Sequence, residues 1–267
     1  MYEMGKTHPV ITLTTDFGLQ DPYVAMMKGV ILGIAPGSTI VDITHSIPPQ
    51  DILRAAIALQ DAQAFFPHGT VHLAVIDPGV GTSRPILGAQ AAGHFFVAPD
   101  NGLLSPILAE SLPKVVRADR PDLAGPQVSA TFHGRDIMAP LAAALANGST
   151  VEELGEVVQT WETLSIPQPI AELGIIRGGV LFADRFGNAV TNIKSSDLEA
   201  ADISAPKALV EVGAYKIAGI RRTYTEVEEG DICALIGSSE RLEIAVRNGS
   251  ASEALGIATF YFPVLIS

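Results

Sequence analysis

In the first part of the chain, short apolar runs alternate with longer segments in which apolar residues recur at helical spacing. The apolar runs, which predict buried strands, lie at 10–14, 38–44, 71–76 and 95–98. The segments with helical spacing lie at 23–34, 51–65, 104–110 and 136–147, and turn sequences such as Pro36-Gly37 end several of them. Strands that alternate with helices predict an α/β fold, with a mostly parallel sheet covered by helices on both faces as an α/β/α sandwich.

The pattern changes after the proline-containing segment 165–174, which is typical of a linker. Beyond it, short apolar runs separated by tight turns replace the alternation of strands and helices. These runs lie at 178–183, 189–193, 208–212, 215–220, 232–236, 241–246 and 259–265. Short strands at this spacing predict a small all-β antiparallel barrel. We therefore expect an α/β catalytic domain at 1–164 and a β-barrel domain at 175–267.

Composition and charge narrow the classes of function. Of the 267 residues, 48% are hydrophobic and 17% are charged, which is typical of a compact globular protein. A formal net charge of −12 and the lack of any Lys/Arg cluster argue against nucleic acid as a partner, because such binding depends on clustered cations. No apolar run reaches the ~20 residues that a bilayer span requires, so we expect no membrane association.

The single cysteine, Cys233, rules out an internal disulfide, and its apolar surroundings in the sequence predict an inert buried thiol. The first ten residues lack the basic and apolar regions of a signal peptide. We therefore expect the protein in the cytoplasm.

Polar motifs follow the predicted strands of the first domain, and one of them places two charged residues around a glycine turn. Asp77 comes directly after the apolar run 71–76, and Arg84 follows the turn Pro-Gly-Val-Gly. His133 lies in another polar motif, Thr-Phe-His-Gly-Arg-Asp. Because loops that follow parallel strands meet at one edge of the sheet, we expect Asp77, Arg84 and His133 to form a charged cluster in a cleft there.

Taken one at a time, these residues have simpler structural explanations. An aspartate before Phe17-Gly18 is typical of a turn or helix cap, and His45 is typical of a packed histidine. Asp77 and Arg84 alone are typical of a surface salt bridge. The segment 184–188 is typical of a tight turn, and the spacing of Gly79 and Gly81 fits no phosphate-binding loop.

Taken together and in order, seven motifs resemble the S-adenosylmethionine (SAM) hydroxide adenosyltransferases, which are SAM hydrolases related to the SAM-dependent chlorinase and fluorinase. The motifs are T-T-D-F-G, D-I-T-H-S-I-P-P, V-I-D-P-G-V-G-T-S-R, A-P-D-N-G-L-L, F-H-G-R-D, D-R-F-G-N-A-V-T-N-I and L-E-I-A-V-R-N-G-S-A. The resemblance extends from about residue 11 to the last predicted strand.

This resemblance implies a homotrimer that binds its substrate SAM where two subunits meet, with no metal or organic cofactor. It also implies a catalytic triad of Asp77, Arg84 and His133, which marks the hydrolase branch. The halogenating branch carries other residues at the positions of Asp77 and His133, with tyrosine at the first. Gly134 stands where the fluorinase has a fluoride-binding serine. The expected nucleophile is therefore water, and the expected products are adenosine and L-methionine.

The resemblance further implies seven substrate-binding residues, which are Asp16, Asp184, Phe186, Asn188, Ser238, Glu243 and Val246. Asp16 is implied to accept hydrogen bonds from the ribose hydroxyls, as a carboxylate can from two donors at once. The three residues of the segment 184–188 are implied to hold the methionine portion, and Ser238 its carboxylate. The last two residues are implied to lie near the adenine edge. Ser239 stands where the fluorinase has arginine, so carboxylate recognition is expected to differ.

Three alternatives stay open from the sequence. A non-catalytic SAM or adenosine sensor would bind SAM and leave it intact. A chlorinase would form 5′-chloro-5′-deoxyadenosine when chloride is added. A metal-dependent hydrolase would use Asp16, His45, Asp77 and His133 as ligands and lose activity on chelation, although no metal-binding spacing supports it.

Overall fold

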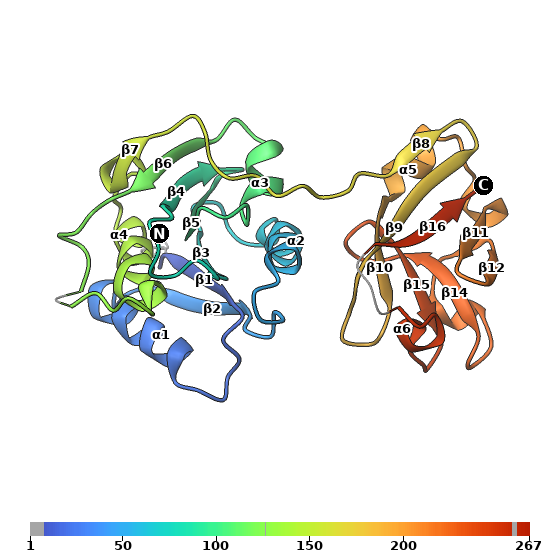
Figure 1. Ribbon diagram of the computed structural model, residues 1–267, viewed down its shortest axis with the longest axis horizontal. Coiled ribbons are helices and arrows are strands. Elements are labelled where there is room, and N and C mark those ends of the chain that lie inside the picture. The colour runs from blue at the N-terminus through green and yellow to red at the C-terminus, as the bar shows by residue number, and fades with distance from the viewer. Residues whose placement is uncertain (1–7, 126, 258–260) are drawn as a thin grey trace, which may run out of the picture. The chain divides into compact units, whose positions relative to one another are not determined.

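The computed structural model describes residues 8–125, 127–257 and 261–267 (Figure 1). Contacts within the chain divide it into two compact units, Met1–Ser165 and Ile166–Ser267. None of the helices in the described ranges is long and apolar enough to cross a lipid bilayer.

The first unit contains a mixed seven-stranded sheet in the order β2-β1-β3-β5-β4-β6-β7. Its parallel half consists of β1 (Val10–Thr15), β2 (Thr39–Thr44), β3 (Val71–Val75) and β5 (His94–Pro99). Its antiparallel half consists of β4 (Ile86–Ala91), β6 (Lys114–Ala118) and β7 (Gly155–Val157). The sequence pattern predicts the four parallel strands but none of the three antiparallel ones.

The turn between β4 and β5 explains why this hairpin gave no clear signal. Ala92 and Gly93 form a two-residue turn with φ of 50° and 82°. Positive φ at both positions is the geometry of a type I′ hairpin turn, which asparagine or aspartate usually begins. An alanine in that place does not predict a hairpin, even though the following glycine permits one.

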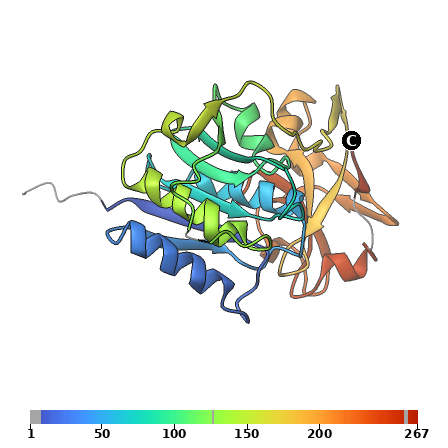
Figure 2. The same cartoon turned by 60° about the vertical axis from the view of Figure 1, so that its left-hand side comes forward.

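Helices cover both faces of this sheet, so the expected α/β fold is confirmed (Figure 1). The helical elements are α1 (Tyr23–Ile34), α2 (Ile52–Gln63), α3 (Ser105–Ala109), a π-helical turn (Gly134–Met138), α4 (Ala139–Ala146) and a 3-10 turn (Glu152–Leu154). Figure 2 shows α1 in blue and α4 in yellow-green on the same side of the sheet. The helix predicted at 136–147 begins at Gly134 in the structure, as the π-helical turn that continues directly into α4.

Alternate residues of the central strands supply the two cores. Leu73 packs with α1 and α4, whereas Ala74 packs with α2 and α3 on the opposite face. On β5 the neighbours Phe96 and Val97 divide in the same way. Burial on both faces accounts for the continuous apolar runs in the sequence, because a half-exposed strand would alternate with polar residues.

The second unit is a nearly closed, mixed β-barrel with the strand order β12-β11-β16-β9-β10-β15-β14-β13, in which β12 approaches β14. Its strands are β8 (Ile170–Glu172), β9 (Ile175–Ala183), β10 (Ala189–Lys194), β11 (Leu209–Val212), β12 (Tyr215–Ala218), β13 (Ile220–Arg221), β14 (Ile232–Ile236), β15 (Arg241–Val246) and β16 (Phe262–Ile266). Its short helices are α5 (Ser195–Ala200), α6 (Ala251–Ala254) and the 3-10 turns Ala205–Lys207 and Tyr224–Glu226.

The barrel predicted from the sequence is confirmed, with one parallel pair of strands and one further strand that were not predicted. The pair β13 and β14 is parallel, whereas the other pairs are antiparallel. β8 lies inside the segment 165–174, for which the sequence pattern predicts a linker. The first two residues of the strand predicted at 259–265 lie outside the described residues.

Candidate active site

The loops that follow the parallel strands of the first unit meet at one edge of the sheet and are joined by hydrogen bonds. Gly18 N–H donates to the carbonyl of His45 at 2.8 Å, which joins the loops after β1 and β2. The Asn101 side chain donates from Nδ2 to the carbonyl of Ile76 at 2.8 Å, which joins the loops after β5 and β3. Asp77 is the residue after Ile76, so Asn101 fixes the backbone from which Asp77 projects.

Asp77, Arg84 and His133 come together at this edge as one hydrogen-bonded group. Arg84 donates from Nε to Asp77 Oδ1 at 2.7 Å, and its Nη2 also contacts Asp77 Oδ2. The same Nη2 lies 3.1 Å from Nδ1 of His133. The Asp77 and Arg84 side chains are only 5% and 11% exposed, so their pair is not a surface salt bridge.

The glycine turn in front of Arg84 is needed to form this group. Gly81 has φ of 80°, and a Cβ atom there would lie 2.5 Å from the carbonyl oxygen of Ala130. A side chain at this position would therefore clash with the segment that leads to His133. The turn brings Arg84 back to Asp77 and packs directly against the backbone that precedes the third member of the group.

The hydrogen bonds of Arg84 determine the protonation of His133. A guanidinium has only donors, so Nδ1 of His133 must accept, and the neutral imidazole then carries its proton on Nε2. Burial and, after it, the Arg84 cation lower the pKa of His133, although Asp77 and Asp136 oppose this. We therefore expect a neutral His133 at neutral pH, with Nε2–H as a hydrogen-bond donor.

Three aromatic rings lie beside the group and connect it to Asp16. Phe17 and Tyr23 have ring centroids 6.0 Å apart, and both pack edge-on against Phe132, at 5.8 and 5.4 Å. Phe17 follows Asp16 in the chain and Phe132 precedes His133. These rings form an apolar surface between the two polar residues, suited to a nucleoside. Tyr23 carried no functional signal in the sequence.

Asp16 is held by one hydrogen bond and keeps acceptor capacity. Within the described part of the chain, the donor recorded for its carboxylate is Gln50 N–H, which is 2.8 Å from Oδ2. Gln50 has φ of 66°, an unusual value for a residue with a side chain, and this backbone conformation aims its N–H at Asp16. The second oxygen of Asp16 can accept donors from a ligand.

His45 is a packed histidine, as one of the structural explanations predicted. It is 4% exposed, its Nδ1 lies 2.8 Å from the Thr15 hydroxyl, and its Nε2 lies 3.1 Å from Asp42 Oδ1. Nowhere in the described ranges do three histidine, cysteine, aspartate or glutamate side chains lie where they could jointly hold a metal ion.

In the second unit, three of the expected substrate-binding residues line one cavity of about 620 Å³. They are Phe186, Asn188 and Val246, and Tyr224 lies beside them. The Phe186 ring is 78% exposed at this cavity. Glu243 reaches the same region, because the Tyr224 hydroxyl lies 3.5 Å from its Oε2. Burial, and then Asp184, raises the pKa of Glu243.

Asp184 and Ser238 fit their implied roles less directly. The Asp184 carboxylate accepts from Phe186 N–H at 2.8 Å, from Asn188 N–H at 2.9 Å and from Asn188 Nδ2 at 3.0 Å. Asp184 therefore builds the turn that presents Phe186 and Asn188, and one lone-pair position is left for an ammonium group. Ser238 is exposed on the turn after β14 and does not line the cavity.

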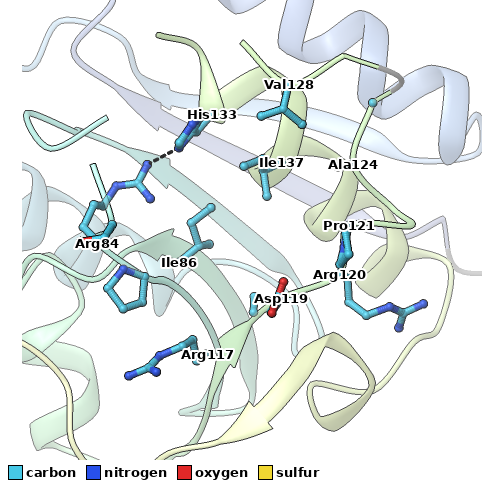
Figure 3. A pocket seen from close by; sticks show the side chains of 14 residues that line it. Arg84, Ile86, Arg117, Asp119, Arg120, Pro121, Ala124, Val128, His133 and Ile137 are labelled. Atoms are coloured by element: carbon cyan, nitrogen blue, oxygen red, sulfur yellow. Dashed lines mark hydrogen bonds between the residues drawn. The ribbon is translucent and has the colours of Figure 1, made fainter. Parts of the chain in front are cut away.

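A second cavity of about 620 Å³ lies in the first unit, next to the catalytic candidates (Figure 3). Arg84 and His133 line it together with Arg117, Asp119 and Arg120, which the sequence analysis did not single out. These three follow one another closely at the end of β6, a strand that the sequence pattern did not predict. Asp136, in the same motif as His133, was also overlooked.

Comparison with known proteins assigns both units. Residues 11–155 match the family described as SAM hydroxide adenosyltransferase N-terminal domain, and residues 178–260 match the corresponding C-terminal domain. An (R)-S-adenosyl-L-methionine hydrolase of Thermus thermophilus is 45% identical over 93% of this chain and 96% of its own. A fluorinase of an Actinoplanes species is 30% identical over 73% of this chain and 75% of its own. A crystal structure from Thermotoga maritima shares 34% identity and a TM-score of 0.90, covering 96% of this chain and 99% of its own.

Proposed function

The chain belongs to the SAM hydroxide adenosyltransferase family, and we propose that it hydrolyses (R)-S-adenosyl-L-methionine to adenosine and L-methionine. The observation that carries this proposal is the hydrogen-bonded, partly buried group of Asp77, Arg84 and His133. Four relatives named as (R)-SAM hydrolases, 35–45% identical over 93% of the chain, support the same activity. Since "L" specifies the α-carbon, "(R)" specifies the configuration at the sulfonium sulfur.

The reaction is a displacement at C5′ of the adenosyl group. The oxygen of water forms a bond to C5′ while the C5′–S bond breaks, and the electron pair goes to sulfur as the neutral thioether of methionine. One proton leaves the attacking water. A sulfonium departs without a general acid, so the protein must hold a water in line with C5′ and accept its proton.

The hydrogen bonds within the group favour Asp77 as the proton acceptor. In neutral His133, Nδ1 is occupied by Arg84 and Nε2 already carries a proton. The Asp77 carboxylate uses one lone pair of each oxygen toward Arg84 and keeps the others. Arg84 fixes both partners, and His133 can orient the water as a donor through Nε2–H.

Substrate binding by Asp16 and by the residues of the second unit is also part of this proposal. Asp16 has an open carboxylate oxygen for the ribose hydroxyls. The methionine and adenine portions would be held by Asp184, Phe186, Asn188, Ser238, Glu243 and Val246. Asp184 would contribute only the one lone-pair position that its own turn leaves open.

On the basis of the family resemblance we also propose a homotrimer with sites between subunits, which can be tested directly. Co-expressing Asp77→Asn with Asn188→Ala chains restores activity if each site combines two subunits, because some sites in mixed trimers then contain neither substitution. Light scattering measures the mass of the assembly, and no recovery of activity would contradict a shared site.

Product analysis in ¹⁸O-labelled water tests the reaction. We expect the protein to convert (R)-SAM to adenosine that carries ¹⁸O at the 5′ position, faster than it converts the (S) epimer. Adding chloride should leave the products unchanged, whereas 5′-chloro-5′-deoxyadenosine would identify a halogenase. Intact SAM after a long incubation would identify a sensor, and unlabelled adenosine would exclude attack by water at C5′.

We expect the rate of SAM hydrolysis to fall at acid pH, and we expect the midpoint of this fall to lie below pH 6.5. Protonation of His133 at Nδ1 would set two donors against each other and break its hydrogen bond to Arg84. Burial and Arg84 lower the pKa of His133 from 6.5, so the imidazole stays neutral as the pH falls through 6.5. Measurement of kcat from pH 4.5 to 8 should place the acid limb below 6.5. A limb at or above 6.5 would disagree with this assignment.

A further inference from the structure

Asp136, three residues after His133, is a buried carboxylate that forms an ion pair with the partly exposed Arg135, and no step of the reaction uses it. Its side chain is 8% exposed and accepts from Arg135 Nε at 2.6 Å and from Arg135 Nη2 at 2.9 Å. Both residues belong to the π-helical turn at Gly134–Met138. Such turns are rare and often occur at functional sites.

This carboxylate ties down the segment that leads into His133. Ser129 N–H donates to Asp136 Oδ2 at 2.8 Å, and Gly125 N–H donates to the backbone carbonyl of Asp136 at 3.1 Å. Between Ser129 and His133 lies Ala130, whose carbonyl packs against Gly81 in the turn before Arg84. Asp136 is thus linked through a short stretch of backbone to the turn that carries Arg84.

The π-helical turn that contains Arg135 and Asp136 is itself closely packed against its neighbours. A Cβ atom on Gly134 would lie 3.1 Å from Val75 at the end of β3, so the turn packs directly under the strand that leads to Asp77. On its other side, the Arg135 guanidinium lies 5.0 Å from the centre of the Phe132 ring. Phe132, which precedes His133, is therefore held by Arg135. Gly134, which follows His133, is held by its close packing against Val75.

We propose that Asp136 is a positioning residue of the hydrolysis, which holds His133 at hydrogen-bond distance from Arg84 and supplies a negative charge beside the imidazole. This inference rests on the proposed function. Asp136 acts through His133 and has no assigned contact with substrate.

The charges around His133 make this role measurable. Arg84 and Asp77 face it from the loop after β3, and Asp136 faces it from its own turn. Arg84 lowers the pKa of His133, whereas Asp77 and Asp136 raise it. Removing Asp136 should therefore lower this pKa further. Removing Arg135 leaves the Asp136 charge without its counterion, so the pKa of His133 should rise.

The test compares Asp136→Asn and Arg135→Met with Asp122→Asn as a matched control. Asp122 also forms a two-bonded pair with a neighbouring arginine, Arg120, in the same region, but its side chain is 60% exposed. We expect Asp136→Asn to lower kcat roughly tenfold to a hundredfold with a nearly constant KM, since a small misplacement of a catalytic group has that effect. The control should stay within about twofold, as expected for an exposed pair.

The second readout is the pKa of His133, measured by NMR of the imidazole nitrogens without substrate and assigned with a His133→Gln variant. It should fall in Asp136→Asn and rise in Arg135→Met. A reduced kcat with an unchanged pKa of His133 would mean that Asp136 has a purely structural role, and this would overturn the proposal. A kcat and a His133 pKa that both match those of the Asp122→Asn control would also overturn it. If Asp136→Asn does not fold, an unchanged pKa in Arg135→Met still overturns it and a raised one supports it. Because the NMR titration needs no turnover, a wild-type protein without hydrolase activity would disprove the proposed function separately.

Discussion

Replacing Asp77 with asparagine is expected to lower kcat for SAM hydrolysis by about 10²–10⁴-fold, the usual contribution of a general base. The amide has nearly the same shape but cannot accept the proton of the attacking water. It also turns an NH₂ group toward Arg84, which presents donors to both oxygens of Asp77 in the native protein. The loss should appear in kcat because the carboxylate acts on the water and not on SAM itself.

Two measurements are needed for this variant. Rapid quenching with chromatography gives kcat, and calorimetric titration with SAM should give a dissociation constant within a few-fold of the wild type. The Asp122→Asn protein again serves as the control for loss of one carboxylate. A kcat close to that of the wild type would remove Asp77 from the mechanism. Loss of SAM binding would place it in substrate recognition.

Acidification is expected to destabilise the fold strongly through His72. This residue is fully buried near the start of β3, where its Nδ1 lies 2.7 Å from the Thr12 hydroxyl and its ring stacks on Phe96. Burial, helped by the neighbouring His94, lowers the pKa of His72 to about 3. An unfolded chain binds a proton at this histidine below about pH 6.5, whereas the folded chain stays neutral there until about pH 3.

The sign of the effect follows from that difference. The stabilisation is complete above pH 6.5 and is lost as the pH falls from 6.5 to about 3. At about 1.4 kcal/mol per pH unit, this one residue should lower the free energy of unfolding by about 5 kcal/mol over that range. Urea denaturation at several pH values between 7 and 3.5 measures the loss.

A His72→Leu variant isolates this contribution. The leucine leaves the Thr12 hydroxyl without its histidine partner, so its stability at pH 7 should be lower than that of the wild type. The comparison therefore uses the change in unfolding free energy with pH, which should be clearly smaller in the variant. Equal pH dependence in the two proteins would mean that another group controls acid unfolding.

The sequence predicted those parts of the fold whose signal is local. Helix α1 was predicted at its observed bounds, 23–34, because its apolar spacing ends at a Pro-Gly turn. The parallel strands β1, β3 and β5 were predicted because they are almost wholly buried and therefore give continuous apolar runs. Strands β6 and β7 were not predicted, because only two of the five residues of β6 are buried and β7 has just three residues at the edge of the sheet.

The site shows the same division between local and non-local information. Asp77, Arg84 and His133 could be predicted together because parallel strands end at one edge and because their motifs resemble a known family. The protonation of His133 could not, since it depends on a 3.1 Å approach between residues 49 positions apart in the chain. The role of Asp136 depends likewise on which backbone folds back onto it.

The sharing of Arg84 between Asp77 and His133 also constrains how such a site can evolve. A single substitution at either partner leaves a nearly buried cation half-satisfied, which weakens the old reaction before any new one is gained. Exchange of the nucleophile would then require coordinated changes, and the order in which mutations arise would matter. Coupling of this kind predicts that the effects of substitutions at Asp77 and His133 are not additive.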